Sequence, residues 1–180
     1  MWNNLRMFLW MTLLTGVLYP MLVTGIAQFT MKEKADGQWI SHKGKVVGSL
    51  LIGQTFEGEK YFWGRPSAIK YNPLPSGGSN LGPTSSALKK IVDERREKIA
   101  KSHAAQEIPS ELLFASGSGL DPHIRRRTAY FQMERVAKAR GIEVHKIQEL
   151  IDRIAERPSF GFLGARHVNV LLLNKALDEL

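Results

Sequence analysis

The chain has 180 residues, a formal net charge of +8 and no cysteine. The lack of cysteine excludes disulfide bonds and thiolate metal sites, and the length suits one core-forming domain in addition to a short terminal segment. The positive charge favours anionic partners such as lipid headgroups or an acidic protein face, whereas nucleic acid is not expected, because no recognition motif accompanies the charge.

The N-terminal run 7–31 contains no charged side chain. A helix rises about 1.5 Å per residue and about 20 apolar residues cross a bilayer, so residues 1–31 are predicted to form a short tail and a transmembrane helix. Pro20 removes one backbone hydrogen bond and is expected to bend this helix. Gly16 and Gly25 would let a neighbouring helix approach closely. We therefore expect Gly16, Pro20 and Gly25 to contact another membrane protein.

Two other interpretations of this run stay open. A cleavable signal peptide would find a small-x-small site at residues 25–27, although the apolar run is longer than such peptides use. A buried helix of a soluble protein would normally be shorter or show polar residues at helical spacing. The orientation is also open. Lysines within residues 32–45 follow the run and Arg6 precedes it, which favours a cytoplasmic domain, but this rule weakens for long translocated domains.

After the apolar run the pattern becomes polar and then β-rich. Residues 32–45 are polar and charged and are predicted to be a juxtamembrane spacer, while residues 46–180 are predicted to be the soluble domain. The run 45–52 is β-branched and aliphatic and is bounded by glycines, which indicates a strand. The apolar run 61–63 is expected to pair as a second strand. The loop 66–83 combines prolines, glycines and serines without repetition, which is typical of an ordered functional loop.

Helical patterns dominate the remaining residues. Asp121 as N-cap and Pro122 at the first helical position predict the start of a helix. Residues 104–109 are expected to be a connector and residues 112–115 a brief strand or turn. Helices are predicted from residues 83–85 to about 102, from 122 to 140 and from 144 to 156, and residues 168–180 should begin as a strand and continue as a helix. Strands first and helices later favour an α+β domain over a doubly wound sheet.

Two glycine-rich segments are candidates for binding an anion. The candidate nucleotide- or anion-binding residues are Ser76, Gly77, Gly78, Ser79 and Asn80. Glycine amides there can cradle a phosphate, but the segment lacks the P-loop lysine and does not follow a strand directly, so a structural turn is the favoured interpretation. Residues 116–119 precede a predicted helix N-terminus, where the dipole favours anions. Here too the favoured interpretation is structural: these residues shape the turn by which the chain enters the helix.

No catalytic constellation is found in the sequence. The serines lack evident histidine and acid partners, and the carboxylates fall on charged helix faces. The five histidines do not show metal-ligand spacing. We therefore expect no metal, no tightly bound cofactor and no enzymatic activity.

Several polar side chains are candidates for contact with a partner. Arg125, Arg126 and Arg127 fall in the first turn of a predicted helix, where cations oppose the dipole, and are expected to meet lipid phosphates or acidic partner residues. Gln132 and Arg135 share one helical face, which forms either a partner groove or an ordinary surface.

Asn169 and Asn174 flank an apolar run near the end of the chain. If they are buried, their side chains need backbone hydrogen-bond partners.

A set of short motifs together resembles one family. They are, in chain order, Tyr19-Pro20 in the apolar run, Gly48-Ser49, Leu51-Ile52-Gly53-Gln54, Tyr61-Phe62, Gly64-Arg65-Pro66-Ser67-Ala68, Tyr71-Asn72-Pro73, residues 76–83, residues 115–121, Gln132, residues 135–140 and residues 168–170. In their order and spacing the chain resembles, along nearly its whole length, the C-subunit family of the Kdp potassium-transporting P-type ATPases. It departs from that family at Arg126, where a proline is expected, and at Leu172, where an acidic residue is expected.

The resemblance implies a non-enzymatic accessory subunit of an ATP-driven, high-affinity potassium-uptake pump. Its partners would be a channel-like potassium-translocating subunit, an ATP-hydrolysing subunit and a small hydrophobic subunit of the inner membrane. The family's C subunit is needed for assembly and is described as a catalytic chaperone that raises the ATP affinity of the ATP-hydrolysing subunit. Its Ser-Gly-Gly motif has been likened to a transporter-ATPase signature. Arg65, Asp121 and Asn169 lie in the shared motifs and join the expected partner contacts.

The family's soluble domain is placed outside the cytoplasm, so ATP is expected to act at the level of the complex and not by direct contact. A positive domain repels potassium, which favours a clamp or entrance cover over an electrostatic funnel. Two alternatives remain open. One is a nucleotide-binding chaperone that acts from the cytoplasm, and the other is a membrane-anchored domain that acts alone on an unrelated substrate.

Overall fold

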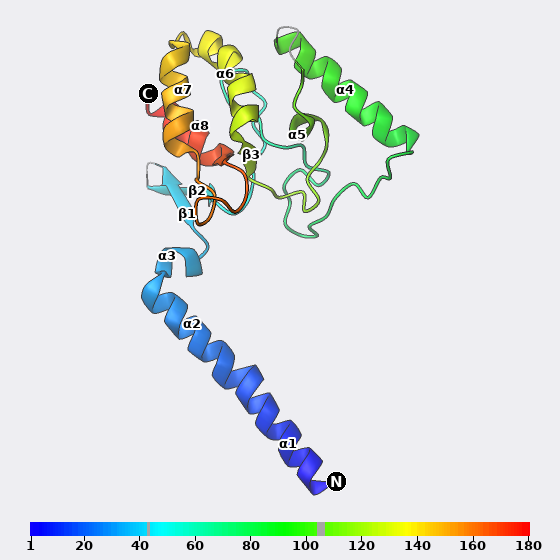
Figure 1. Cartoon of the computed structure of the whole chain (residues 1–180), viewed down its shortest axis with the longest axis vertical. Coiled ribbons are helices and arrows are strands. Elements are labelled where there is room, and N and C mark those ends of the chain that lie inside the picture. The colour runs from blue at the N-terminus through cyan, green and yellow to red at the C-terminus, as the bar shows by residue number, and fades with distance from the viewer. Residues whose placement is uncertain (43, 104–106) are drawn as a thin grey trace. The chain divides into compact units, whose positions relative to one another are not determined.

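The computed structural model of the chain describes residues 1–42, 44–103 and 107–180 (Figure 1). Residue 43 of the predicted spacer and residues 104–106 of the predicted connector lie outside the described residues. The chain divides into two compact units, Met1–Ser49 and Leu50–Leu180. Each unit is described by itself.

The first unit begins with a continuous helix from Trp2 to Thr30, which is long and apolar enough to cross a membrane. It comprises α1 (Trp2–Leu13), the π-helical segment η1 (Leu14–Leu18) and α2 (Tyr19–Thr30). Pro20 lies two residues after the end of η1. Because its ring crowds the carbonyl of Gly16, four residues earlier and inside η1, a widened turn is the expected local response. The predicted helix is confirmed, and one N-terminal apolar helix fits a single-pass membrane protein.

A short helix and a β-hairpin complete this unit. Helix α3 (Lys32–Ala35) is followed by strand β1 (Trp39–His42), which pairs antiparallel with β2 (Lys45–Ser49). The predicted strand is therefore confirmed over 45–49, but its partner lies within the segment predicted to be a spacer. Gly44 has φ 76°, which favours glycine, and it immediately precedes β2. The spacer role of residues 32–45 stays a prediction.

The predicted strand at 61–63 is absent. The N–H and carbonyl of Phe62 bond to the side-chain amide of Asn174 at 2.8 and 2.9 Å, and those of Trp63 bond to Gln132 at 2.8 and 3.0 Å. A primary amide carries both an N–H donor group and an acceptor oxygen, as a neighbouring strand does. Side chains therefore replace the expected strand, and the buried Asn174 has the backbone partners that the sequence analysis required.

The second unit is built mainly of helices, with one short ribbon. Its elements are α4 (Ser86–Ser102), α5 (Ser110–Leu113), β3 (His123–Arg125), α6 (Arg126–Arg140), α7 (Val144–Ile154), β4 (His167–Asn169) and α8 (Val170–Asp178). Strands β3 and β4 pair antiparallel, with Ile124 opposite Val168. The mixed α+β fold is confirmed, as are the helix after Ser85 and the strand-to-helix ending of the chain.

Two predicted boundaries were wrong in this unit. Helix α6 starts at Arg126 and not at Pro122, because residues 123–125 pair with β4 and Asp121 caps the N–H of His123 instead of a helix. Residues 110–113 form one helical turn, which overlaps the brief strand or turn predicted at 112–115. Helix α7 ends at Ile154, two residues early, and Glu156 then bridges to β4.

The main core of the second unit lies where α6, α7, α8 and the β3–β4 ribbon meet. Its fully buried side chains include Phe62, Ile124, Val136, Ile147, Leu150, Ile151, Val168, Leu173 and Leu177. A smaller cluster joins α4 to α5 through Val92, Ile99, Leu112 and Leu113. The residues before β3 connect α5 of the smaller cluster to the β3–β4 ribbon of the main core.

Candidate functional site

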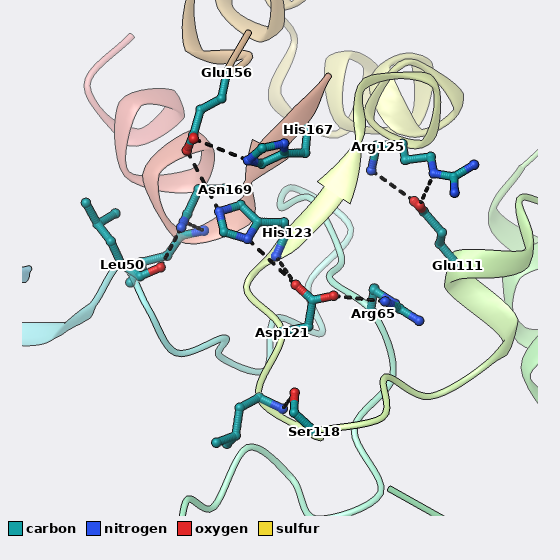
Figure 2. Close-up of polar contacts among 12 residues, drawn as sticks. Leu50, Arg65, Glu111, Ser118, Asp121, His123, Arg125, Glu156, His167 and Asn169 are labelled. Carbon is teal, nitrogen blue, oxygen red and sulfur yellow. Dashed lines mark hydrogen bonds and ion pairs between the residues drawn. The ribbon is translucent and has the colours of Figure 1, made fainter. Parts of the chain in front are cut away.

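Asp121 lies at the centre of the polar contacts drawn in Figure 2. One of its carboxylate oxygens accepts a hydrogen bond from Arg65 Nη1 at 2.9 Å, and the other accepts from the backbone N–H of His123 at 3.0 Å. Burial opposes ionisation of this carboxyl, but the hydrogen bonds from His123 and Arg65 outweigh it and lower its pKa to about 2. Asp121 is therefore a fixed anion that joins two distant segments.

The loop that carries Arg65 is held by Ser67 and Tyr71. The Ser67 hydroxyl donates to the carbonyl of Gly119 at 2.7 Å and accepts from the N–H of Tyr71 at 2.9 Å. The Tyr71 hydroxyl donates to the carbonyl of Arg65, and burial, followed by the charge of Asp121, raises the pKa of Tyr71. We call Gly53, Arg65, Ser67, Tyr71, Gly119 and Asp121 the polar junction.

Gly53 shows how tightly the polar junction is packed. Its N–H donates to the carbonyl of Leu120 at 2.8 Å. A Cβ at this position would lie 2.4 Å from the Tyr71 ring and 2.8 Å from the carbonyl oxygen of Asp121. Only glycine fits, which accounts for the glycine at this place in the motif.

The two glycine-rich segments lie against each other. The N–H of Gly77 donates to the carbonyl of Ser118 at 3.0 Å. A Cβ on Gly78 would lie 3.0 Å from the carbonyl oxygen of Gly117, and one on Gly119 would lie 2.6 Å from that of Gly77. These contacts support the structural-turn interpretation, because the Gly77 amide is already used. Nucleotide binding by residues 76–80 stays a prediction.

The three consecutive arginines each face a carboxylate of the second unit. Glu111 accepts from Arg125 Nε at 3.0 Å and also from the Arg125 N–H and the Thr128 hydroxyl. It thereby places a negative charge at the N-terminus of α6, which offsets the unfavourable dipole interaction expected from the arginines. Arg126 pairs with Asp152 at 3.3 Å. Arg127 is 85% exposed and lies 4.0 Å from Glu107, so it is the most accessible of the three.

Gln132 and Arg135 are buried in α6 and bind the segment 59–63 of their own unit. The Arg135 guanidinium donates to the carbonyls of Glu59 and Tyr61 and lies 3.9 Å from the Trp63 ring centre. Burial lowers the pKa of Arg135 to about 10, although Glu59 acts in the opposite direction. The shared face predicted from the sequence is therefore an internal surface.

Asn169 joins the end of β4 to the start of the second unit. Its Nδ2 donates to the carbonyl of Leu50 at 2.7 Å, and its Oδ1 caps the first N–H groups of α8. Gly16, Pro20 and Gly25 belong to the other unit. For all of the predicted residues, contact with a partner stays a prediction.

A turn between α7 and β4 exposes large apolar side chains. Phe160 and Phe162 are 89% and 77% exposed, and the backbone of Ser159 bonds to that of Leu163. We call residues 159–164 the phenylalanine loop. No helix or strand was predicted between residues 156 and 168, and apolar residues between glycines do not reveal which way they point.

Two histidines and a glutamate also converge in a way that the sequence spacing did not show. His123 Nε2 lies 3.8 Å from one carboxylate oxygen of Glu156, and His167 Nε2 lies 3.2 Å from the other. Their ligand atoms all lie within 4.8 Å of one another. Residues 123, 156 and 167 are far apart in sequence, so only the β3–β4 pairing could have revealed them.

Comparison with known proteins places this architecture in a family. A family profile described as the c chain of K+-transporting ATPase, KdpC, matches residues 1–179. A relative from Janthinobacterium sp. (strain Marseille) is 46% identical, with 97% of this chain and 95% of the relative covered. Relatives from Geobacter metallireducens and Serratia proteamaculans are 46% and 45% identical, each over 98% of this chain and over 95% and 96% of their own lengths. All three are named potassium-transporting ATPase KdpC subunits. The chain therefore belongs to the KdpC family, the c chain of the K+-transporting ATPases.

Proposed function

We propose that this chain is a non-catalytic accessory subunit of an ATP-driven potassium-uptake pump, where it is needed to assemble and stabilise the complex. The observation that carries the proposal is the family match, which extends over both the apolar helix and the folded unit. The function thus depends on the two units together.

The proposed partners are a channel-like potassium-translocating subunit, an ATP-hydrolysing subunit and a small hydrophobic subunit in the inner membrane, with lipid around them. The apolar helix supports contact with such partners, because its large side chains are exposed within this chain. The described neighbours of Gly25 leave open space, and Gly16 has only a Thr12 methyl at 4.0 Å. A second helix can therefore approach both glycines closely.

The folded unit acts in this proposal as a rigid clamp or cover outside the cytoplasm. The polar junction and the buried Arg135 fix its loops, and the phenylalanine loop offers an apolar contact to another subunit. The net charge of +8 disfavours a role in collecting potassium. An effect on the ATP affinity of the ATP-hydrolysing subunit then passes through protein contacts and not through bound nucleotide.

The alternative is direct nucleotide binding by residues 76–80. A hollow of about 550 Å³ is lined by Gly78, Ser79 and Arg95, among others, and gives that alternative its one structural support. Equilibrium dialysis of the purified chain against ATP separates the two functions. Saturable ATP binding that is lost in Ser79→Ala would favour the alternative.

Assembly is tested by replacing Gly16 or Gly25 with leucine and purifying the complex through a C-terminal tag on this chain. Because neither position has a close neighbour in the chain, we expect normal membrane insertion but loss of the co-purifying subunits. Val23→Leu is the matched control. Full recovery of the complex with both glycine variants would contradict contact at these glycines.

Topology is tested by a single introduced cysteine, since the chain has none of its own. Lys146→Cys places a thiol on the exposed face of α7. A membrane-impermeant maleimide should label it in cells whose inner membrane is intact. Labelling only after lysis would place the domain in the cytoplasm.

A further inference from the structure

The cluster formed by His123, Glu156 and His167 lies on the outer face of the β3–β4 ribbon. His123 is opposite Asn169 in the register, so His167 is its diagonal neighbour on the same face. The intervening pair, Ile124 and Val168, points into the core. Glu156 is added by a backbone bridge in which its N–H donates to the carbonyl of His167 at 2.9 Å.

Each imidazole ring has an acceptor oxygen near its Nδ1 atom. His167 Nδ1 lies 3.1 Å from the carbonyl oxygen of Ala165; a carbonyl can only accept, so Nδ1 carries the proton and Nε2 keeps its lone pair when the ring is neutral. His123 Nδ1 faces an oxygen of Asp121 at 3.7 Å, and that carboxylate is held by Arg65. Figure 2 shows His123 between Asp121 and Glu156, with the His167 ring beside that of His123 and facing the same Glu156 carboxylate.

A histidine that donates its far N–H to a carboxylate or backbone carbonyl is the usual arrangement of a metal ligand. When both rings are neutral with the proton on Nδ1, their Nε2 lone pairs face the Glu156 carboxylate, which is electrostatically unfavourable. A divalent cation among the three atoms would remove this repulsion. The carbonyl of Ala165 stands behind His167 and the carboxylate of Asp121 stands behind His123, which are the positions of the groups that orient metal ligands.

We propose that His123 Nε2, His167 Nε2 and a carboxylate oxygen of Glu156 bind a Zn²⁺ ion, with water in the fourth position. Two imidazoles and one carboxylate suit zinc better than Mg²⁺ or Ca²⁺, which prefer oxygen ligands. Zinc–ligand bonds of about 2.0–2.2 Å place tetrahedral ligand atoms roughly 3.3–3.6 Å apart. The observed separations, up to 4.8 Å, require only a small closure of partly exposed side chains.

The metal would act as a clip on the segment between α7 and β4. This segment carries the phenylalanine loop, and Glu156 lies just before it while His167 lies just after it. Bound zinc would tie both ends of the loop to β3. Zinc binding itself does not require the proposed pump function, since all three ligands come from one unit.

The test is zinc titration of the full chain, purified in detergent through a tag without histidine and stripped with EDTA. Calorimetry with ZnCl₂ should show one site per chain that an excess of Mg²⁺ does not fill. His123→Ala and His167→Ala should each weaken binding by about 100-fold or more, and Asp121→Asn by about 10–100-fold as a positioning residue. His145→Ala is the matched control, because His145 faces Glu149 at 3.8 Å on an exposed helix face and should leave binding unchanged.

A second measurement on the unmodified chain does not depend on the folding of variants. Co²⁺ added in place of zinc should give the visible absorption of a tetrahedral site with nitrogen and oxygen ligands, and Zn²⁺ should displace it. The proposal is overturned if the chain binds no zinc saturably, or if the affinity is the same in folded His123→Ala and His167→Ala chains. NMR titration that finds both rings as imidazolium partners of Glu156, unaffected by zinc, would also overturn it.

Discussion

The helix Trp2–Thr30 and helix α6 distribute their side chains in opposite ways. The large apolar residues of Trp2–Thr30 are exposed, and none of the residues in its apolar window is buried. Helix α6 is much more polar, yet it buries Gln132, Arg135 and Val136. The first helix therefore needs an apolar environment from outside the chain, whereas α6 obtains its partners from the chain itself.

This contrast separates two sources of stability. In the second unit, buried polar groups are satisfied by backbone atoms that are distant in sequence, so loss of one partner leaves several groups unpaired. In the apolar helix, hydroxyls bond within the helix, as Thr15 does to the carbonyl of Met11 at 2.7 Å. Substitutions in the second unit should consequently lower the free energy of unfolding, whereas substitutions in the apolar helix should alter membrane insertion.

The largest effect is expected at Arg135. Arg135→Met removes hydrogen bonds to the carbonyls of Glu59 and Tyr61 and to the Gln132 side chain, and bonds from a charged donor contribute about 1.5–3 kcal/mol each. We expect the free energy of unfolding in urea to fall by about 4 kcal/mol. Arg127→Met, at an exposed arginine of the same helix, should change it by less than about 0.5 kcal/mol. Equal losses for both variants would show that the Arg135 contacts contribute little.

A lysine in the apolar helix should change the free energy of unfolding of the second unit less than Arg135→Met does. It should instead weaken insertion of the helix into the membrane. Val17 is 43% exposed, and a lysine at the centre of a transmembrane helix costs about 3 kcal/mol. Val17→Lys should lower the fraction of the chain that resists alkaline extraction from membranes. Leu74→Lys, at an 82% exposed site of the second unit, should leave that fraction unchanged. Equal extraction of both variants would contradict insertion of the helix.

The packing of the two glycine-rich segments is tested by a pair of neighbouring glycines. Gly119 has φ 69°, and an added Cβ would lie 2.6 Å from the carbonyl oxygen of Gly77, whereas Gly117 has nothing described within 4 Å. Gly119→Ala should lower the free energy of unfolding by about 2 kcal/mol, and Gly117→Ala by much less. Thermal unfolding of the two variants decides this, and a reversed order would refute the described contact.

The smallest expected effect is the pH dependence at His103. Burial lowers the pKa of this imidazole, with Arg135 adding to the effect while Ile99 and Glu59 oppose it. The unfolded chain therefore takes up a proton below about pH 6.5 that the folded chain resists. Stability should be unaffected above that pH and should decrease as the pH falls through the lowered pKa. Urea unfolding should show that the free energy of unfolding falls between pH 7.5 and pH 5.5. This fall should be smaller in His103→Gln than in the unmodified chain, by less than about 1 kcal/mol.

The sequence located those elements whose signals are local. The apolar run, the start of α4 just after residues 83–85, the end of α6 at Arg140 and the change from strand to helix near the end of the chain all appear where they were predicted. The motifs also indicated the family. Each of these signals lies within a few residues, so hydropathy, capping and turn chemistry suffice to read it.

The partners of these elements were decided only by the tertiary structure. Nothing near Phe62 indicates that Asn174 replaces a neighbouring strand, and nothing near Asp121 indicates that β4 delays the start of α6. The same holds for the candidate sites: the junction of Arg65 with Asp121 and the meeting of His123, Glu156 and His167 each require chain segments far apart in sequence. Side-chain hydrogen bonds and short-strand pairing leave no periodic trace, because they depend on where the core places each segment and not on its neighbours along the chain.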